Sequence, residues 1–314
     1  MSKLQKFVNK NELGAGTRGS SLSFDAIRFE ALNNGFDLGD VTYLLANNEV
    51  LFNKHIKQDE NALNIDGLLD YYKKNIKILM KEIDYSKNQF FYSADHASSG
   101  LYLSAFKRLN PDARIGVIWI DAHGDMHSPY TTPSGNMHGM TLSIALREEN
   151  LEWKKRDINE DLKRKWKELQ LLSGDKKALN YGDLVFIGIR DLEKEEKYIL
   201  DQNNVKHYLV DEARDEGIEE CAKDVLDMLK KCDHIYISFD VDSMDPRMVS
   251  FGTGTPVSKG FSLEETKSLI NVLTSSDKKV TFEIVEINPL LDSQDTMVRK
   301  CLDIIEVVYN NLDK

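Results

Sequence analysis

The sequence predicts an α/β protein of three layers, in which a mostly parallel β-sheet lies between two layers of helices. Short apolar runs rich in β-branched and aromatic residues alternate with longer segments of helical periodicity along the chain. These apolar runs leave no polar face for water. Strands buried on both faces are typical of parallel sheets covered by helices.

The expected strands and helices follow from these two patterns. Six buried strands are expected at residues 90–92, 115–120, 184–189, 207–210, 235–239 and 280–287. Helices are expected at residues 67–83, 140–147, 218–229, 263–273 and 296–312. The segment 147–177 carries dense mixed charge with tryptophan and leucine interspersed, which predicts one or two solvated amphipathic helices.

The bulk composition is that of an ordinary globular protein. The chain has 314 residues, of which 41% are hydrophobic and 30% charged, with only 6 prolines. No repeat or linker divides it, so a single domain over residues 1–314 is expected. A net charge of -11 disfavours binding to nucleic acid or to an anionic membrane, because a polyanion would be repelled. Small cationic substrates suit this charge better.

The chain also lacks the signals of secretion and of thiol chemistry. Its N-terminus has no apolar signal-peptide run, and no stretch is long enough to span a bilayer, so a cytoplasmic protein is expected. Cys221, Cys232 and Cys301 are odd in number and have no C-x-x-C spacing, so they predict neither a disulfide framework nor a thiolate zinc site. They are interpreted as packing residues or surface thiols.

Acidic residues and a histidine follow one of the expected strands. The run 115–120 leads directly into Asp121, His123 and Asp125. If the chain stays extended, side chains at these alternate positions point the same way. In an open α/β sheet, functional groups collect beyond the carboxyl ends of the strands, so this is where a site is expected.

Three further strand ends repeat this pattern. The run 235–239 leads into Asp240 and Asp242. The run 90–92 leads towards His96, and the run that begins at residue 280 leads towards Glu286. A single aspartate after a strand usually caps a helix or forms a turn. That reading does not explain four aspartates gathered at one edge, because they would repel and raise each other's pKa unless a cation neutralised them.

The residue types narrow the choice of metal. Carboxylates with imidazoles and no thiolate favour a hard divalent ion such as manganese over structural zinc, while iron, cobalt and nickel stay open. The carboxylates exceed what one ion needs, so two bridged ions are expected. Such a pair lowers the pKa of a shared water and yields hydroxide near neutral pH.

Several strings together resemble a known family. DAHGD, SGNMHGM, SFDVDSMDP and EINP, in this order, are similar to motifs of the arginase branch of the ureohydrolase family. GAGTRGSSLSFDAIR and GTGTPV also resemble segments of that family. The resemblance implies a three-layer α/β fold, two Mn2+ ions per subunit and a homotrimer or higher homo-oligomer. It implies that a metal-bridging hydroxide hydrolyses L-arginine to L-ornithine and urea.

The resemblance also assigns roles to residues. One ion would be held by His96, Asp121, Asp125 and Asp240, and the other by Asp121, His123, Asp240 and Asp242. Asp125 would relay a proton to the departing amine, and His138 would shuttle protons. Glu286 would pair with the substrate guanidinium. The residues expected to bind the substrate are His127, Ser134, Asn136, Glu193, Glu196 and Thr255.

Three departures from the family pattern bear on specificity and on metal binding. His127 replaces the usual asparagine, and a protonated His127 would strengthen recognition of the substrate carboxylate. Glu193 replaces an aspartate, and SADHAS replaces GGDHS, which could shift His96. An agmatinase, another guanidino-compound ureohydrolase and a non-catalytic metal-binding homologue stay open as alternatives. A single-zinc deacetylase is disfavoured by the two aspartate pairs and Glu286.

Overall fold

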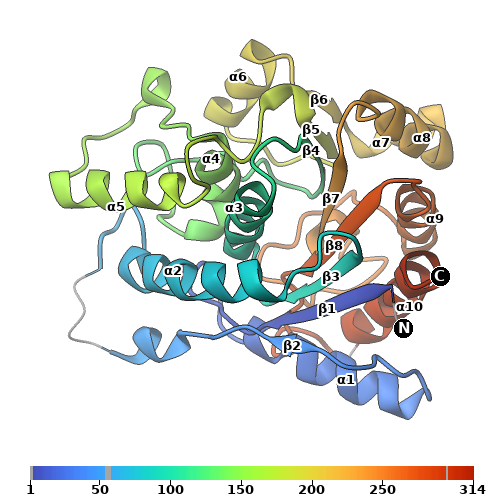
Figure 1. The fold of residues 1–314 in the computed structure, drawn as a ribbon. Helices are drawn as coiled ribbons and strands as arrows, with labels where there is room; N and C mark the ends of the chain where they lie inside the picture. The colour runs from blue at the N-terminus through green and yellow to red at the C-terminus, as the bar shows by residue number, and fades with distance from the viewer. Residues whose placement is uncertain (1–2, 54–57, 295) are drawn as a thin grey trace.

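A central sheet of eight strands organises the computed structural model, which describes residues 3–53, 58–294 and 296–314. The remaining residues of the expected 1–314 domain lie outside this description. The strand order is β2-β1-β3-β8-β7-β4-β5-β6, and every neighbouring pair is parallel. Helices cover both faces of the sheet (Figure 1). The predicted three-layer α/β class is confirmed.

All six predicted strands are present; the 115–120 run has the bounds of β4, and the other five have shifted ends. The strands are β1 Leu4–Asn9, β2 Thr42–Tyr43, β3 Asn88–Ser93, β4 Ile115–Ile120, β5 Leu184–Ile187, β6 Lys206–Tyr208, β7 His234–Asp240 and β8 Lys279–Val285. The end predicted for the 207–210 run is wrong, because Val210 already begins a helix. β1 and β2 were not expected, since β1 mixes polar with apolar residues and β2 has only two residues.

The five predicted helices are confirmed, with ends that differ by at most two residues. The helices are α1 Ser23–Asn33, α2 Ile65–Glu82, α3 Ser99–Leu109, α4 Thr141–Leu146, α5 Glu160–Leu171, α6 Lys194–Gln202, α7 Val210–Glu216, α8 Ile218–Met228, α9 Leu263–Thr274 and α10 Thr296–Leu312. The charged segment forms a short 3-10 turn at Leu151–Trp153 and then α5. α3 was missed because its first nine residues are all buried, which leaves no polar face to reveal a helical period.

Two apolar clusters form the core, one on each face of the sheet. Along β4, Val117 and Trp119 point into one cluster, while Ile118 and Ile120 point into the other. All three cysteines are buried and free, which confirms that they are not paired with each other. Among the residues that the structure describes, no helix combines the length and apolar character that crossing a membrane requires.

One buried histidine in the core leads to a stability prediction. His234, fully buried at the start of β7, packs between the rings of Tyr85 and Phe106 and hydrogen-bonds Thr281 through Nε2 at 2.8 Å. Burial lowers the pKa of His234 from 6.5 to about 4. Between these two pH values His234 is therefore neutral in the folded protein, whereas it is protonated in the unfolded chain. This contribution to stability is complete above pH 6.5 and is lost as the pH falls towards 4.

In the metal-free protein, His234 alone is expected to lower the free energy of unfolding by about 3 kcal/mol as the pH falls from 6.5 to 4. Denaturant unfolding of the His234→Asn variant should therefore show a shallower decline of stability with acid than wild type. His207→Asn, at a partly exposed position on β6, serves as the matched control and should decline like wild type. Equal declines in all three proteins would refute the assignment.

Candidate metal centre and active site

The order of the central strands brings the predicted residues together. β3, β8, β7 and β4 are consecutive neighbours in the sheet, and all run in the same direction. The four carboxyl ends therefore meet at one edge. They carry, in that order, His96, Glu286, the pair Asp240 and Asp242, and the series Asp121, His123 and Asp125.

A first group surrounds the ring of His96. Its Nδ1 atom lies 3.1 Å from Asp121 Oδ2, 3.1 Å from Asp125 Oδ2 and 3.2 Å from Asp240 Oδ2. All four side chains are buried. The SADHAS turn, despite its serine and alanine, places His96 at the centre of the ligand set predicted for the first ion. The structure therefore gives no sign that this turn displaces the histidine.

A second group surrounds the ring of His123. Its Nδ1 atom lies 3.4 Å from Asp121 Oδ1 and 3.1 Å from Asp242 Oδ2. Asp121 thus turns one carboxylate oxygen towards each histidine, which is the arrangement of a bridging ligand. Asp121 Oδ1 also accepts the backbone N–H of His123 at 2.7 Å, and Asp240 Oδ1 accepts that of Asp242 at 2.8 Å. The bridging roles of both aspartates stay predictions.

The charges of these groups call for a cation. Burial, together with repulsion from Asp242 and Asp121, raises the pKa of Asp240. Burial alone would lower the pKa of His96, but the three carboxylates around its Nδ1 atom raise it well above the ordinary value. Crowded carboxylates of this kind are stable when they are protonated or when a metal ion neutralises them.

The geometry of the two groups also fits metal ions. His96 Nδ1 and Asp121 Oδ2 are buried and have no hydrogen-bond partner among the described residues. Ligand atoms separated by 3.1 to 3.4 Å are spaced as neighbours around an ion with bonds on the order of 2.1 Å. The donors are carboxylate oxygens and imidazole nitrogens without a thiolate, which suits divalent ions such as manganese.

The backbone around the ligands departs from the predicted extended form. Asp125 has a φ of 49° and Glu286 a φ of 64°, both in the left-handed region. Val241–Ser243 forms a 3-10 turn. The prediction that alternation in an extended chain aligns these side chains is therefore wrong, because tight turns at the strand ends aim them instead. Non-glycine residues in the left-handed region are uncommon and are often found at functional sites.

Glu286 and His138 form a pair beside the first group. Glu286 Oε1 accepts the backbone N–H of His96 at 3.0 Å and lies 3.3 Å from His138 Nδ1. Burial opposes protonation of His138, but Glu286, Asp125 and Asp95 together raise its pKa to about 9. Burial would raise the pKa of Glu286, but the contact with His138 lowers it overall. At neutral pH the pair therefore consists of an imidazolium and a carboxylate.

A cavity of about 250 Å3 opens beside these groups. It is lined by His123, Asp125 and His138 and by all six predicted substrate-binding residues, namely His127, Ser134, Asn136, Glu193, Glu196 and Thr255. Thr255 also donates a hydrogen bond to Asp242 Oδ2 at 2.8 Å, so it orients a candidate ligand as well. Asp191 lines the same cavity and was not predicted, although it lies two residues before Glu193.

Burial shifts the pKa values of two cavity residues towards their uncharged forms. Burial raises the pKa of Glu196 to about 8 and lowers the pKa of His127 to about 4. His127 Nε2 lies 3.7 Å from Glu196 Oε2, and Glu196 Oε1 accepts the backbone N–H of Met126 at 3.1 Å. A protonated His127 is therefore not favoured, and this residue offers a neutral ring to a substrate carboxylate.

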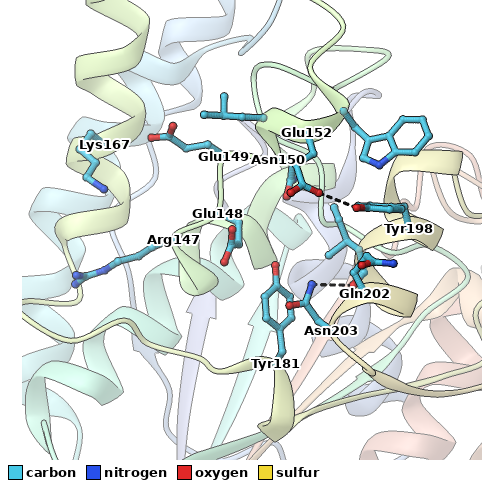
Figure 2. Close-up of a pocket in the computed structure, with 13 residues that line it drawn as sticks. Arg147, Glu148, Glu149, Asn150, Glu152, Lys167, Tyr181, Tyr198, Gln202 and Asn203 are labelled. Atoms are coloured by element: carbon cyan, nitrogen blue, oxygen red, sulfur yellow. Dashed lines mark hydrogen bonds between the residues drawn. The ribbon is translucent and has the colours of Figure 1, made fainter.

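A larger cavity of about 580 Å3 lies elsewhere, lined mainly by the segment 147–153 that follows α4 and by residues of α6. Figure 2 shows Glu148 and Tyr181 facing each other within it, and the Tyr198 hydroxyl donating a hydrogen bond to Glu152. No predicted site residue lines this cavity. The smaller cavity is therefore the candidate active site, because it alone of the two borders the ligand groups.

Several buried residues that support the site were not predicted. Ser238 and Glu283 lie in the strands beneath it, and Asp95 accepts the backbone N–H of Gly14 at 2.7 Å. Arg190 donates hydrogen bonds to four backbone carbonyls, including that of Asp242 at 2.7 Å. The signal available for Ser238 and Glu283 was a polar residue inside a predicted buried strand.

Known proteins show the same fold and the same family. The profile of the Arginase family matches residues 16–308. The arginase of Bacillus subtilis (strain 168) is 29% identical over 301 residues, which cover 94% of this chain and 93% of that protein. A crystal structure of arginase from Bacillus subtilis superposes with a TM-score of 0.78 at 27% identity, and 98% of each chain is covered.

A second solved structure supports the fold alone. The crystal structure of Entamoeba histolytica arginase in complex with L-ornithine superposes with a TM-score of 0.82 at 23% identity, and 98% of each chain is covered. The sequence match over most of the chain, the common fold and the two histidine and aspartate groups at one sheet edge agree with each other. This chain belongs to the arginase family.

Proposed function

We propose that this chain hydrolyses L-arginine to L-ornithine and urea at a centre of two manganese ions. The observation that carries the proposal is the pair of ligand groups that share Asp121 and border a cavity beside Glu286 and His138. Proteins named arginase match most of this chain, and one of them was solved in complex with L-ornithine.

The residues divide into two ligand sets. His96, Asp121, Asp125 and Asp240 would hold one ion, while Asp121, His123, Asp240 and Asp242 would hold the other. When bound, the ions would acidify a water molecule and so supply the nucleophile for the guanidinium carbon. Thr255 and the backbone of Asp242 keep the carboxylates of Asp242 and Asp240 oriented through hydrogen bonds.

Charged side chains then orient the substrate and move its protons. Glu286 would pair with the substrate guanidinium, since its lowered pKa keeps it ionised beside the cavity. Asp125 would carry the proton of the attacking water to the nitrogen that departs as the amine. His138, with a pKa of about 9, is protonated at neutral pH and can exchange protons with this region.

The far end of the cavity suits the α-substituents of an amino acid. Ser134 and Asn136 offer hydrogen bonds, and neutral His127 offers a ring N–H, to an α-carboxylate. Glu193 and Asp191 lie where an α-ammonium group would gain from acidic neighbours, and Glu196 would accept a hydrogen bond from that group as an uncharged acid. Agmatine lacks the carboxylate and would leave the hydrogen-bond donors of this end unpaired.

A substrate comparison tests this proposal. Metal-free protein loaded with manganese should release urea from L-arginine with a kcat/KM at least ~10²-fold above that for agmatine or guanidinobutyrate, because a site built for hydrogen bonds rejects analogues that lack them. Chelation should remove the activity and manganese should restore it. A higher kcat/KM for agmatine would refute the arginase assignment, and activity that survives chelation would refute the metal centre.

Assembly, location and domain structure belong to the same proposal. We propose a homotrimer or a higher homo-oligomer, in which each chain forms a single domain, located in the cytoplasm. Sedimentation analysis of the manganese-loaded protein would measure the oligomeric state directly.

A further inference from the structure

Three strand residues lie in one row directly beneath the ring of His96. In the register of the sheet, Trp119 of β4 pairs with Ser238 of β7, and Ser238 pairs with Glu283 of β8. Side chains at paired positions of neighbouring strands point to the same face. All three are fully buried, and two of them, Ser238 and Glu283, are polar.

Each member of the row has a defined contact. The ring of His96 stacks on Trp119 with centroids 4.1 Å apart and planes 4° from parallel. His96 Nε2 lies 2.7 Å from Ser238 Oγ. Ser238 Oγ in turn donates to Glu283 Oε2 at 3.1 Å. The ring plane and one ring nitrogen of His96 are thereby held by the sheet itself.

The direction of these hydrogen bonds determines where the histidine keeps its proton. A serine hydroxyl has one proton to donate, and Ser238 gives it to Glu283. The oxygen of Ser238 must then accept from His96, which places a proton on Nε2. The imidazole that binds a metal ion is neutral and carries only one N–H, so in that form the lone pair would be on Nδ1, the atom that faces Asp121, Asp125 and Asp240.

We propose that the row formed by Trp119, Ser238 and Glu283 holds the ring of His96 in place. In this row Ser238 is a positioning residue that keeps Nδ1 of His96 free to bind a metal ion. This inference rests on the proposed function in one respect, because it needs the metal centre. Partners that fix the tautomer of a ligand histidine commonly contribute about 10- to 100-fold to metal affinity. Ser238 belongs to neither ligand group and does not line the cavity.

A matched pair of variants separates this role from packing. Ser238→Ala removes the bond to His96, whereas Ser99→Ala removes a hydroxyl that donates to the same Glu283 Oε2 at 2.5 Å from α3. Titration of metal-free protein with manganese should show one of the two ions bound about 10- to 100-fold more weakly in Ser238→Ala. Ser99→Ala should bind both ions like wild type. Electron paramagnetic resonance should report a coupled manganese pair in wild type and Ser99→Ala, and an uncoupled ion in Ser238→Ala at limiting manganese.

The outcomes discriminate between the hypotheses. Equal affinities in Ser238→Ala and Ser99→Ala would overturn the positioning role. So would a metal-free Ser238→Ala protein that melts far below metal-free Ser99→Ala, because the loss would then lie in the fold. Urea release enters neither measurement. A wild-type protein that binds two ions but releases no urea would refute the proposed reaction and leave the role of Ser238 standing.

Discussion

Replacement of Asp125 by asparagine is expected to lower kcat for urea release by roughly 10²- to 10⁴-fold. Asp125 Oδ2 lies 3.1 Å from His96 Nδ1, within the first ligand group, and the residue also lines the cavity. Asparagine has nearly the same shape, but its amide cannot carry a proton at neutral pH. It is also a weaker metal donor than a carboxylate. Both losses act on the same step, so the effect should be the largest of any single polar substitution in the site.

Steady-state kinetics with saturating manganese would measure this change, and metal analysis of the same sample would show how much arises from lost binding. Asp201→Asn, on the exposed surface of α6, changes the same chemical group without touching the cavity and is the matched control. Its kcat should equal that of wild type. An Asp125→Asn variant with more than a tenth of the wild-type kcat would remove Asp125 from the proton pathway.

Replacement of Glu286 by glutamine is expected to lower kcat/KM by about 10²- to 10³-fold while both ions stay bound. A buried carboxylate paired with a guanidinium forms two charge-assisted hydrogen bonds, and an amide offers one acceptor without charge. Glu286 lies outside both ligand groups, so metal content should not change. This combination distinguishes Glu286 from Asp125, whose replacement affects the metal as well.

The same variant should alter the pH profile. Burial alone would lower the pKa of His138, and Glu286 contributes the strongest opposing interaction, which holds that pKa at about 9. Glutamine removes the negative charge, so His138 should lose its proton at lower pH. The alkaline limb of the kcat/KM profile should move to lower pH. Glu220→Gln, an exposed change on α8, should leave the profile in place. An unshifted profile in Glu286→Gln would contradict the pairing.

Much of the fold followed from local patterns. The apolar runs of the central strands and the amphipathic helices α2, α8, α9 and α10 have periods that few other arrangements satisfy, so their positions were predicted within two residues at most helix ends. α3 and β1 were missed for opposite reasons. α3 is buried all round and shows no period, whereas β1 carries polar residues that dilute its apolar run.

The candidate site was predicted in its residues but not in its geometry. The strand-end motifs and the family resemblance supplied all six proposed ligands, and the resemblance supplied the six substrate-binding residues that line the cavity. Neither could indicate the left-handed turn at Asp125, where the carbonyl of Asp125 accepts a hydrogen bond from the backbone N–H of Leu142, a residue distant in sequence. The neutral state of His127 likewise follows from burial by segments distant in sequence.

By itself, the sequence determined the fold class, the strand ends that carry acids and imidazoles, and the need for cations to neutralise them. These depend on residue type and on spacing along the chain. Only the tertiary structure decided that β3, β8, β7 and β4 lie side by side, and that Trp119, Ser238 and Glu283 form one row under His96. Strand order and register arise from packing between segments far apart in sequence, so no local pattern records them.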